Sequence, residues 1–194
     1  MKLNEIANIS TGYSFRTKVR HDPEGDTKVI QMGNIDEYEG VVAEGLSRIA
    51  DFTPRSDRYF LSPGDVIMLN KGYNLHAHVI PEGLGKVIAA NSFTVLKVVS
   101  EHVVPEYLAW FLNANRTQHF LESISAGTNT PSLPKRILET VNVDLPPKKK
   151  QQVLCEIDRL KRKEAMLQRK IAKKKEQFID ALLQQQNDEW ISNN

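Results

Sequence analysis

Three polar segments hold the side chains with the greatest capacity to bind a ligand: residues 13–20, 71–78 and 128–136. Arg and Lys bind phosphates and guanine edges, whereas Asn forms paired hydrogen bonds with adenine in the major groove. These residue types predict contacts with DNA. Taken singly, each segment is also consistent with an ordinary polar surface loop. The candidate DNA-binding residues are Arg16, Lys18, Arg20, Lys71, Tyr73, Asn74, His76, His78, Thr128, Asn129, Lys135 and Arg136.

Residue patterns that would indicate catalysis are missing from the sequence. No Gly-rich phosphate loop or dinucleotide fingerprint occurs, and no nucleophile is paired with a base. His76 and His78 lack a carboxylate or Cys at ligand spacing, so no metal site is predicted. The single cysteine, Cys155, excludes an internal disulfide. We therefore predict no catalytic residues, no metal and no cofactor.

The chain has no apolar run near the ~20 residues of a membrane span, and its N-terminus lacks the apolar core of a secretory signal. These features predict a cytoplasmic protein without a membrane partner.

Short apolar runs separated by turns position the polar segments. Strands are expected at 28–32, 66–69, 79–80, 87–88 and 93–99, and the alternation in 141–145 predicts one more. Pro105 begins a helix, and the polar step at 113–115 indicates a kink or a break in it. The sequence predicts an α+β fold with a mixed, β-rich core and short helices.

A long helix is expected after Pro146-Pro147, because residues 148–186 contain neither Gly nor Pro. Its length would be roughly 50 Å, more than a compact domain of this size can cover. The helix is therefore expected to pair with another helix, although packing on its own domain is the alternative.

Steps of four and three residues along this helix select a largely apolar row, which we call the seam. Its nine positions run from Val153 to Ala181, and Glu164 and Lys174 interrupt it. A row of this length favours a coiled coil, in which the two charges could pair across the interface. The candidate dimerisation residues are Val153, Ile157, Leu160, Leu167, Ile171 and Phe178.

Charge is distributed unevenly along the chain. Residues 148–194 contain 12 Lys or Arg and 7 Asp or Glu, whereas residues 1–147 contain 14 and 17. A basic helix could follow a phosphate backbone, or it could be the solvated face of a coiled coil. Charge alone leaves both interpretations open.

A set of motifs in fixed order resembles the specificity (S) subunit of Type I restriction-modification systems. The motifs cover nearly the whole chain, and their order carries the resemblance more than any one of them. They are residues 3–9 with Gly12, 31–35, 61–67, 89–96, 105–113, Gly127-Thr128 with Leu133, and 143–147 followed by Gln151-Gln152.

The resemblance implies a target recognition domain at 1–146, a spacer and dimerisation helix at 147–186, and a C-terminal tail at 187–194. Such a domain reads one half of a split DNA target without catalysing a reaction. Family members usually carry two domain–helix units whose helices pack antiparallel, and this sequence holds one. The seam is therefore expected to form an intermolecular antiparallel coiled coil, giving a homodimer that reads a palindromic split site.

The partners implied by the resemblance are double-stranded DNA, methyltransferase (M) subunits and the restriction (R) subunit. The basic flank of the helix would serve either M-subunit docking or the DNA spacer. One alternative is a structural or regulatory half-subunit that pairs with a full-length S subunit or with M subunits without reading DNA. Another is a stand-alone nuclease or acyltransferase, for which the sequence offers no acid cluster or nucleophile–base pair.

Overall fold

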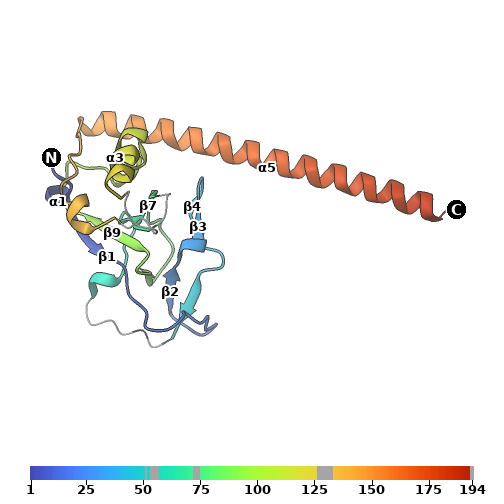
Figure 1. Ribbon diagram of the computed structural model, residues 1–194, viewed down its shortest axis with the longest axis horizontal. Helices are drawn as coiled ribbons and strands as arrows, with labels where there is room; N and C mark the ends of the chain where they lie inside the picture. Colours follow the sequence, from blue (N-terminus) through green and yellow to red (C-terminus); the bar gives the residue numbers. More distant parts are fainter. Residues whose placement is uncertain (51, 53–56, 72–74, 126–132, 193–194) are drawn as a thin grey trace. The chain divides into compact units, whose positions relative to one another are not determined.

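The computed structural model of the protein describes residues 1–50, 52, 57–71, 75–125 and 133–192 (Figure 1). The chain divides into two units, Met1–Glu156 and Ile157–Asn194. In the described part of the chain, no helix combines the length and the apolar character needed to cross a membrane.

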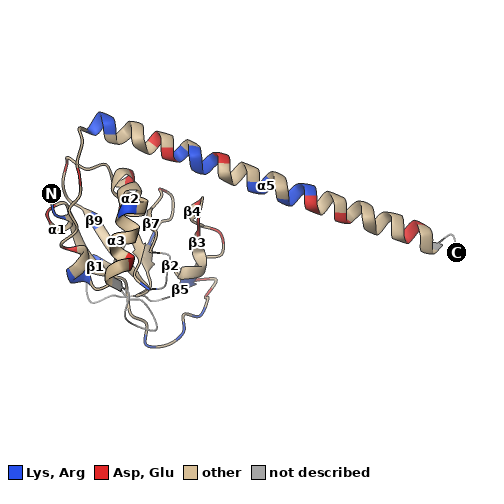
Figure 2. Cartoon of the chain, turned by 45° about the horizontal axis from the view of Figure 1, so that its top comes forward, with Lys and Arg blue, Asp and Glu red and all other residues tan. Residues whose placement is uncertain are grey.

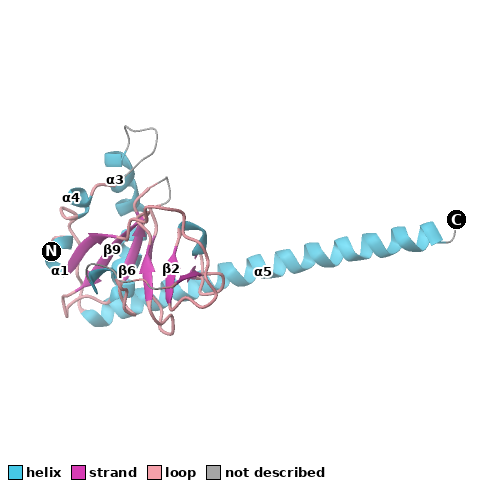
Figure 3. Cartoon of the chain, turned by 90° about the horizontal axis from the view of Figure 1, so that it is seen from below, coloured by secondary structure: helices cyan, strands magenta, loops and turns pink. Residues whose placement is uncertain are grey.

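The described residues of the first unit form three β-sheets, and β2, β6 and β9 are labelled in Figure 3. A four-stranded antiparallel sheet has the order β1-β9-β6-β7. In the three-stranded sheet β5-β2-β8, β2 pairs antiparallel with β5 and parallel with β8, and β3 pairs with β4. The strands are β1 (Ala7–Thr11), β2 (Thr27–Ile30), β3 (Ile35–Asp36), β4 (Gly40–Val41), β5 (Ser47–Ile49), β6 (Val66–Leu69), β7 (Ala77–Val79), β8 (Val87–Ala89) and β9 (Phe93–Val98).

Helices precede, interrupt and follow this series of strands. The described α-helices are α1 (Leu3–Ile6), α2 (Pro105–Asn113), α3 (Asn115–Ser125), α4 (Lys135–Leu138) and α5 (Lys148–Ser192), and the short 3₁₀ helices are Met32–Asn34 and Asp57–Tyr59. The predicted α+β class, with a β-rich core and a long C-terminal helix, is confirmed.

Strand β6 is buried on both of its faces, which explains its uninterrupted apolar sequence. Val66 and Met68 lie in one core cluster, and Ile67 points to the opposite face, in a second cluster. The same division holds in β9, where Leu96 belongs to the first cluster and Val95 to the second. The two central strands therefore separate two cores.

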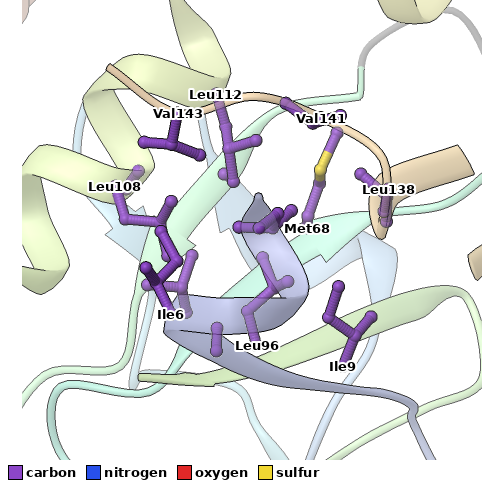
Figure 4. Packing of buried hydrophobic residues seen from close by; sticks show 14 of the residues in the cluster. Ile6, Ile9, Met68, Leu96, Leu108, Leu112, Leu138, Val141 and Val143 are labelled. Carbon is purple, nitrogen blue, oxygen red and sulfur yellow. The ribbon is translucent and has the colours of Figure 1, made fainter. Parts of the chain in front are cut away.

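The first core is closed by residues far apart in the sequence (Figure 4). Ile6 precedes β1, Leu108 and Leu112 lie in α2, and Leu138 ends α4. All four are fully buried at 0% exposure. Residues from both ends of the globular unit thus pack around Met68 and Leu96.

The polar step at 113–115 is a break between two helices. Ala114 has extended backbone angles, φ −63° and ψ 138°, which end α2. The Asn113 amide then accepts a hydrogen bond from the Ala77 N–H at 2.7 Å and donates one to the Ala77 carbonyl at 2.8 Å. This side chain satisfies both backbone groups of Ala77 in β7, the last strand of its sheet.

The strand expected at 141–145 does not form. Its only pairing among the described residues is a single bridge between Asn142 and Lys2. Val141 and Val143 are buried, at 4% and 1% exposure, so the alternation reports packing against the first core. Alternating burial therefore arose without a neighbouring strand.

Helix α5 begins at Lys148, as expected, and ends at Ser192 rather than near Gln186. Most of the predicted tail at 187–194 is therefore helical. The first residues of α5 belong to the globular unit, where Gln151 is fully buried. The Gln151 amide accepts from the Val104 N–H at 2.9 Å and donates to the carbonyls of His102 and Pro146, both at 2.8 Å.

The second unit, taken by itself, is a helix with exposed apolar side chains. The seam residues Ile157, Leu160, Leu167, Ile171 and Phe178 are between 46% and 64% exposed. Apolar side chains of α5 outside the seam positions are exposed to a similar extent. These are Ile179, Leu182, Leu183, Trp190 and Ile191. Lys and Arg recur along α5 from its first turn onward (Figure 2).

Candidate nucleic-acid interface

A cleft of about 670 Å³ lies on the globular unit where five chain segments meet. Among the described residues that line it, three are cationic and none is acidic. These cations are Arg58, Lys71 and Lys135. The body of the protein carries a slight excess of acidic residues, so the cleft is a local basic site.

Strand pairing brings the lining segments together. Thr11 at the end of β1 is paired with Thr94 in β9, and the Asn70 N–H donates to the Ser92 carbonyl at 3.0 Å. The Leu133 N–H donates to the Asn70 carbonyl, also at 3.0 Å, which fixes the segment that leads into α4. The cleft is thus formed where β1, β6 and β9 reach one end of the sheet.

Gly12 is required by the close packing beside this cleft. A Cβ atom on Gly12 would lie 2.2 Å from the Ala90 carbonyl oxygen, closer than real Cβ atoms approach. The Gly12 N–H donates to Phe93 and the next residue, Tyr13, donates to the Ala89 carbonyl at 2.7 Å. These contacts fix the point at which the chain leaves β1.

Asn70 supplies a buried polar group at the wall of the cleft. The side chain is only 7% exposed, and its amide nitrogen donates to the Asn91 carbonyl at 3.1 Å. Within the described ranges, no donor reaches its Oδ1 atom. A buried acceptor without a partner is costly, so Asn70 is a candidate for a hydrogen bond with a bound ligand.

An aromatic cluster adjoins the cleft and supports its cationic side. The Tyr13 ring contacts Phe15 and Phe52 at centroid distances of 4.9 Å, and Tyr59 at 5.1 Å. The Arg58 guanidinium lies 4.8 Å from the Tyr59 ring centroid and donates to the Tyr59 hydroxyl at 2.8 Å. The stacking and the hydrogen bond hold the Arg58 charge at the cleft.

The segment between Tyr13 and Asp22, which we call the arm, is anchored at both ends. Tyr13 bonds to Ala89 as described, and the Asp22 N–H donates to the Arg48 carbonyl at 2.9 Å. His21 Nδ1 also accepts from the Arg48 N–H at 3.2 Å. Between these anchors, Arg16, Lys18 and Arg20 are all exposed.

Comparison with protein families identifies the chain. Residues 1–189 match the Type I restriction modification DNA specificity domain family. The chain belongs to this family. The S-subunit resemblance read from the sequence is therefore confirmed.

Solved structures share the fold of this specificity domain. One is described as an S subunit of a Type I restriction-modification system from M. genitalium, with a TM-score of 0.53 and 12% identity over 81% of this chain. The HsdS subunit from Thermoanaerobacter tengcongensis gives 0.59 and 17% over 87%. A chain from a study of complex assembly and conformational transition in the type I R-M system gives 0.62 and 18% over 87%.

The specificity domain spans only 37%, 39% and 38% of the lengths of the M. genitalium, complex-assembly and Thermoanaerobacter chains, respectively. Among curated protein sequences, none matches this chain.

The structure brings some of the predicted DNA-binding residues of this specificity domain together. Lys71 and Lys135 both line the cleft, and Arg136 is exposed beside Lys135 in α4. His76 is half-buried. Four further candidates, Tyr73, Asn74, Thr128 and Asn129, lie outside the described residues.

His78 does not belong with these residues. It is only 3% exposed, in strand β7 opposite Ile67, and a Cβ atom on Gly40 would lie 3.4 Å from its Nδ1 atom. The imidazole of His78 therefore lies in the interior, apart from the exposed candidates, and its contact with DNA stays a prediction. In the part of the chain that the structure describes, no group of three or more His, Cys, Asp or Glu could hold a metal ion.

Sequence reasoning missed Arg58, Tyr59 and Asn70. Arg58 lies in a stretch without a long predicted element, and its position beside Tyr59 is the one local signal that could have indicated a cation over an aromatic ring. Asn70 directly follows the apolar run of β6, where a polar residue marks the end of a buried strand.

Proposed function

We propose that this chain is a DNA-recognition subunit of a Type I restriction-modification system, reading one half of a split target without catalysing a reaction. The observation that carries the proposal is the basic cleft formed by Arg58, Lys71 and Lys135 on a member of the specificity-domain family. The slightly acidic composition of the rest of the body makes such a cleft the natural site for a phosphate backbone.

The arm and the cleft have different roles in this proposal. Arg16, Lys18 and Arg20 extend from a segment anchored at both ends, so they can follow the DNA surface without unfolding the sheet. In the cleft, Lys71 and Lys135 neutralise phosphates, and the Asn70 Oδ1 atom accepts from a DNA base amino group. Phosphate contacts set the position of the protein, and base contacts set its sequence preference.

A second copy of the chain supplies the second recognition domain. The exposed apolar side chains of α5, from Ile157 to Phe178, form the surface through which two copies associate. A two-fold dimer presents two identical recognition domains and therefore reads a palindromic split site. The dimer positions M subunits, and through them the R subunit, on that site.

The exposed helix also favours one alternative, a structural half-subunit that pairs through α5 but does not read DNA. Reconstitution with a methyltransferase subunit separates the two. The complex is incubated with a library of random DNA, and methylated adenines are mapped by sequencing. We expect methylation within a split, palindromic motif. Methylation without sequence preference, or a complex without site enrichment, contradicts the reading role.

Substitutions in the cleft test where the DNA binds. Lys71→Ala should weaken binding to all sequences and lower the slope of affinity against salt by about one, because one phosphate contact is lost. Lys86→Ala is the matched control, since Lys86 pairs with Asp26 at 2.6 Å and does not line the cleft. Equal effects of both substitutions would place the DNA elsewhere.

Asn70→Ala tests the proposed base contact. It should relax the target at one position by roughly 1–3 kcal/mol, measured as a loss of discrimination between bases there. Uniformly weaker binding with unchanged sequence preference would show that Asn70 supports the cleft without reading a base.

A further inference from the structure

Two charged residues interrupt the seam of α5 within the second unit. Glu164 and Lys174 are both exposed, in a row whose other members include Ile157, Leu160 and Leu167. Glu164 accepts a hydrogen bond from Gln168 of the same helix at 3.2 Å. A charge enclosed by an apolar interface is costly unless it meets an opposite charge.

The spacing of these charges selects how two copies can pair. In a parallel, in-register pair, each Glu164 would face Glu164 of the second copy, and each Lys174 would face Lys174. In an antiparallel pair with its two-fold axis level with Arg169, Glu164 lies level with Lys174 of the second copy, because each is five residues from the axis.

With the two-fold axis at Arg169, the apolar positions of the seam also oppose one another. Leu167 and Ile171 lie two residues from Arg169 and oppose each other across the pair. Leu160 and Phe178, nine residues away on either side, also oppose each other. Ile157 and Ala181, at twelve residues, complete the row. All of these positions belong to the second unit, so the pairing needs no contribution from the globular unit.

We propose that two copies of the chain pair antiparallel through residues 157–181, with the axis at Arg169 and two symmetric Glu164–Lys174 ion pairs. This inference rests on the proposed homodimer and specifies its register. The ion pairs select the orientation and the register, as isolated polar residues do within coiled-coil seams.

Sliding the helices by one heptad keeps the seam aligned but separates the charges. In one direction Glu164 meets Ala181 of the second copy and Lys174 meets Ile171. In the other, Glu164 meets Leu167 and Lys174 meets Ile157. Each slipped dimer encloses four charges without partners, so the unslipped register is strongly favoured.

The residues that flank the seam contribute little to this choice. The register brings Lys161 near Lys175 of the second copy and Lys170 near Lys170, all at exposed positions. Long lysine stems keep their ammonium groups in water, and exposed like-charge contacts of this kind cost little. The enclosed Glu164–Lys174 pairs therefore decide the register.

Charge exchange in the full-length chain tests the proposal. Glu164→Lys alone creates two Lys–Lys contacts, and Lys174→Glu alone creates two Glu–Glu contacts. Each should raise the dimer dissociation constant by at least about 100-fold in sedimentation equilibrium. A mixture of the two variants should form a one-to-one heterodimer, and the double exchange Glu164→Lys with Lys174→Glu should restore the homodimer.

These outcomes test the proposed register separately from the proposed dimer formation. Wild-type protein that remains monomeric contradicts the proposed homodimer, and DNA reading is scored independently by methylation. A wild-type dimer combined with variants that do not form the heterodimer overturns the register alone. In a parallel dimer, the double exchange would leave the like-charge contacts in place, and each single variant would pair preferentially with wild type.

Cysteine cross-linking gives a second measurement in a Cys155→Ala background. Leu160→Cys and Phe178→Cys should each fail to cross-link with themselves under oxidation, because the two thiols lie far apart in the antiparallel pair. The mixed variants should cross-link, since a disulfide needs Cα atoms within about 7 Å of each other. Self-cross-linking of Leu160→Cys, or no cross-linking of the mixture, overturns the proposed register.

Discussion

The globular unit and the helical unit differ in how far similar side chains are exposed. Phe93 in β9 is fully buried at 0% exposure, whereas Phe178 in α5 is 64% exposed. The first unit buries its apolar side chains in two cores of its own. In the described part of the second unit, ion pairs along the helix such as Asp158–Arg162 each add a few tenths of a kcal/mol. The contrast supports the proposed association through the exposed face of α5.

Charged substitutions in the seam should have the largest effect, because they should prevent association through α5. Ile157→Asp combined with Ile171→Asp places four charges in the proposed dimer interface, at several kcal/mol if they are unpaired. We expect a monomer by light scattering, with the unfolding of the globular unit unchanged. Ala172→Asp is a control, since it adds a negative charge beside Ile171 but outside the seam. An unchanged mass for the double variant would mean that α5 does not associate through this face.

Phe93 and Phe178 test whether the stability of the globular unit is independent of the exposed face of α5. Phe93→Ala should lower the free energy of unfolding by about 3–5 kcal/mol, because it leaves a cavity in the core. Phe178→Ala should leave that free energy within about 0.5 kcal/mol of wild type and weaken only association. Urea unfolding followed by Trp110 fluorescence, in a Trp190→Phe background, reports on the globular unit alone. Equal losses of stability would contradict the division into two units.

Gln151 tests the point at which the helix joins the globular unit. Gln151→Met removes three hydrogen bonds and leaves the Val104 N–H and the carbonyls of His102 and Pro146 without this partner. We expect a loss of about 2–3 kcal/mol in urea unfolding. The neighbouring exposed residue provides the control, and Gln152→Met should change the unfolding free energy by less than about 0.5 kcal/mol.

Asp65 should give the smallest effect, visible as a dependence on pH. Burial raises the pKa of its carboxyl above 3.8, although the Ser62 N–H and Lys97 oppose the shift. The folded state therefore holds this proton more tightly than the unfolded state, and stability falls as pH rises from 3.8 through the raised pKa. Asp65→Asn should remove this fall, measured as the difference in unfolding free energy from wild type across pH 3.5–7.

Asp26 provides a comparison of opposite sign. The hydrogen bond from Lys86 is the main cause that lowers the pKa of the Asp26 carboxyl. The stability it contributes is present above 3.8 and is lost as pH falls through the lowered pKa. Asp26→Asn should thus change the pH profile in the opposite direction to Asp65→Asn. The same direction for both would contradict the burial argument for Asp65.

Local signals in the sequence predicted much of this fold. Pro105 correctly indicated the start of a helix, and the polar step at 113–115, predicted as a kink or a break, is a break between α2 and α3. The apolar run at 66–69 correctly predicted β6. The long helix followed from the missing Gly and Pro. These features depend on propensity and period within a short stretch, which is the information that a sequence carries most directly.

Contacts between distant segments were beyond the same reasoning. The parallel pairing of β2 with β8 joins residues almost sixty positions apart. The burial of His78 and the edge-to-face contacts of Tyr13 with Phe52 and Tyr59 depend on how such segments meet. The cleft combines both kinds of information, because Lys71 and Lys135 were predicted singly and only the fold brings them together.

The hydrogen bonds between Asn113 and Ala77 protect the edge of the four-stranded sheet. An open strand edge invites other chains to add strands, which leads to aggregation. At Ala77 both backbone groups are already occupied by the Asn113 amide, so no foreign strand can dock at that residue. The surface proposed for association is then the exposed apolar face of α5 rather than this edge of the sheet.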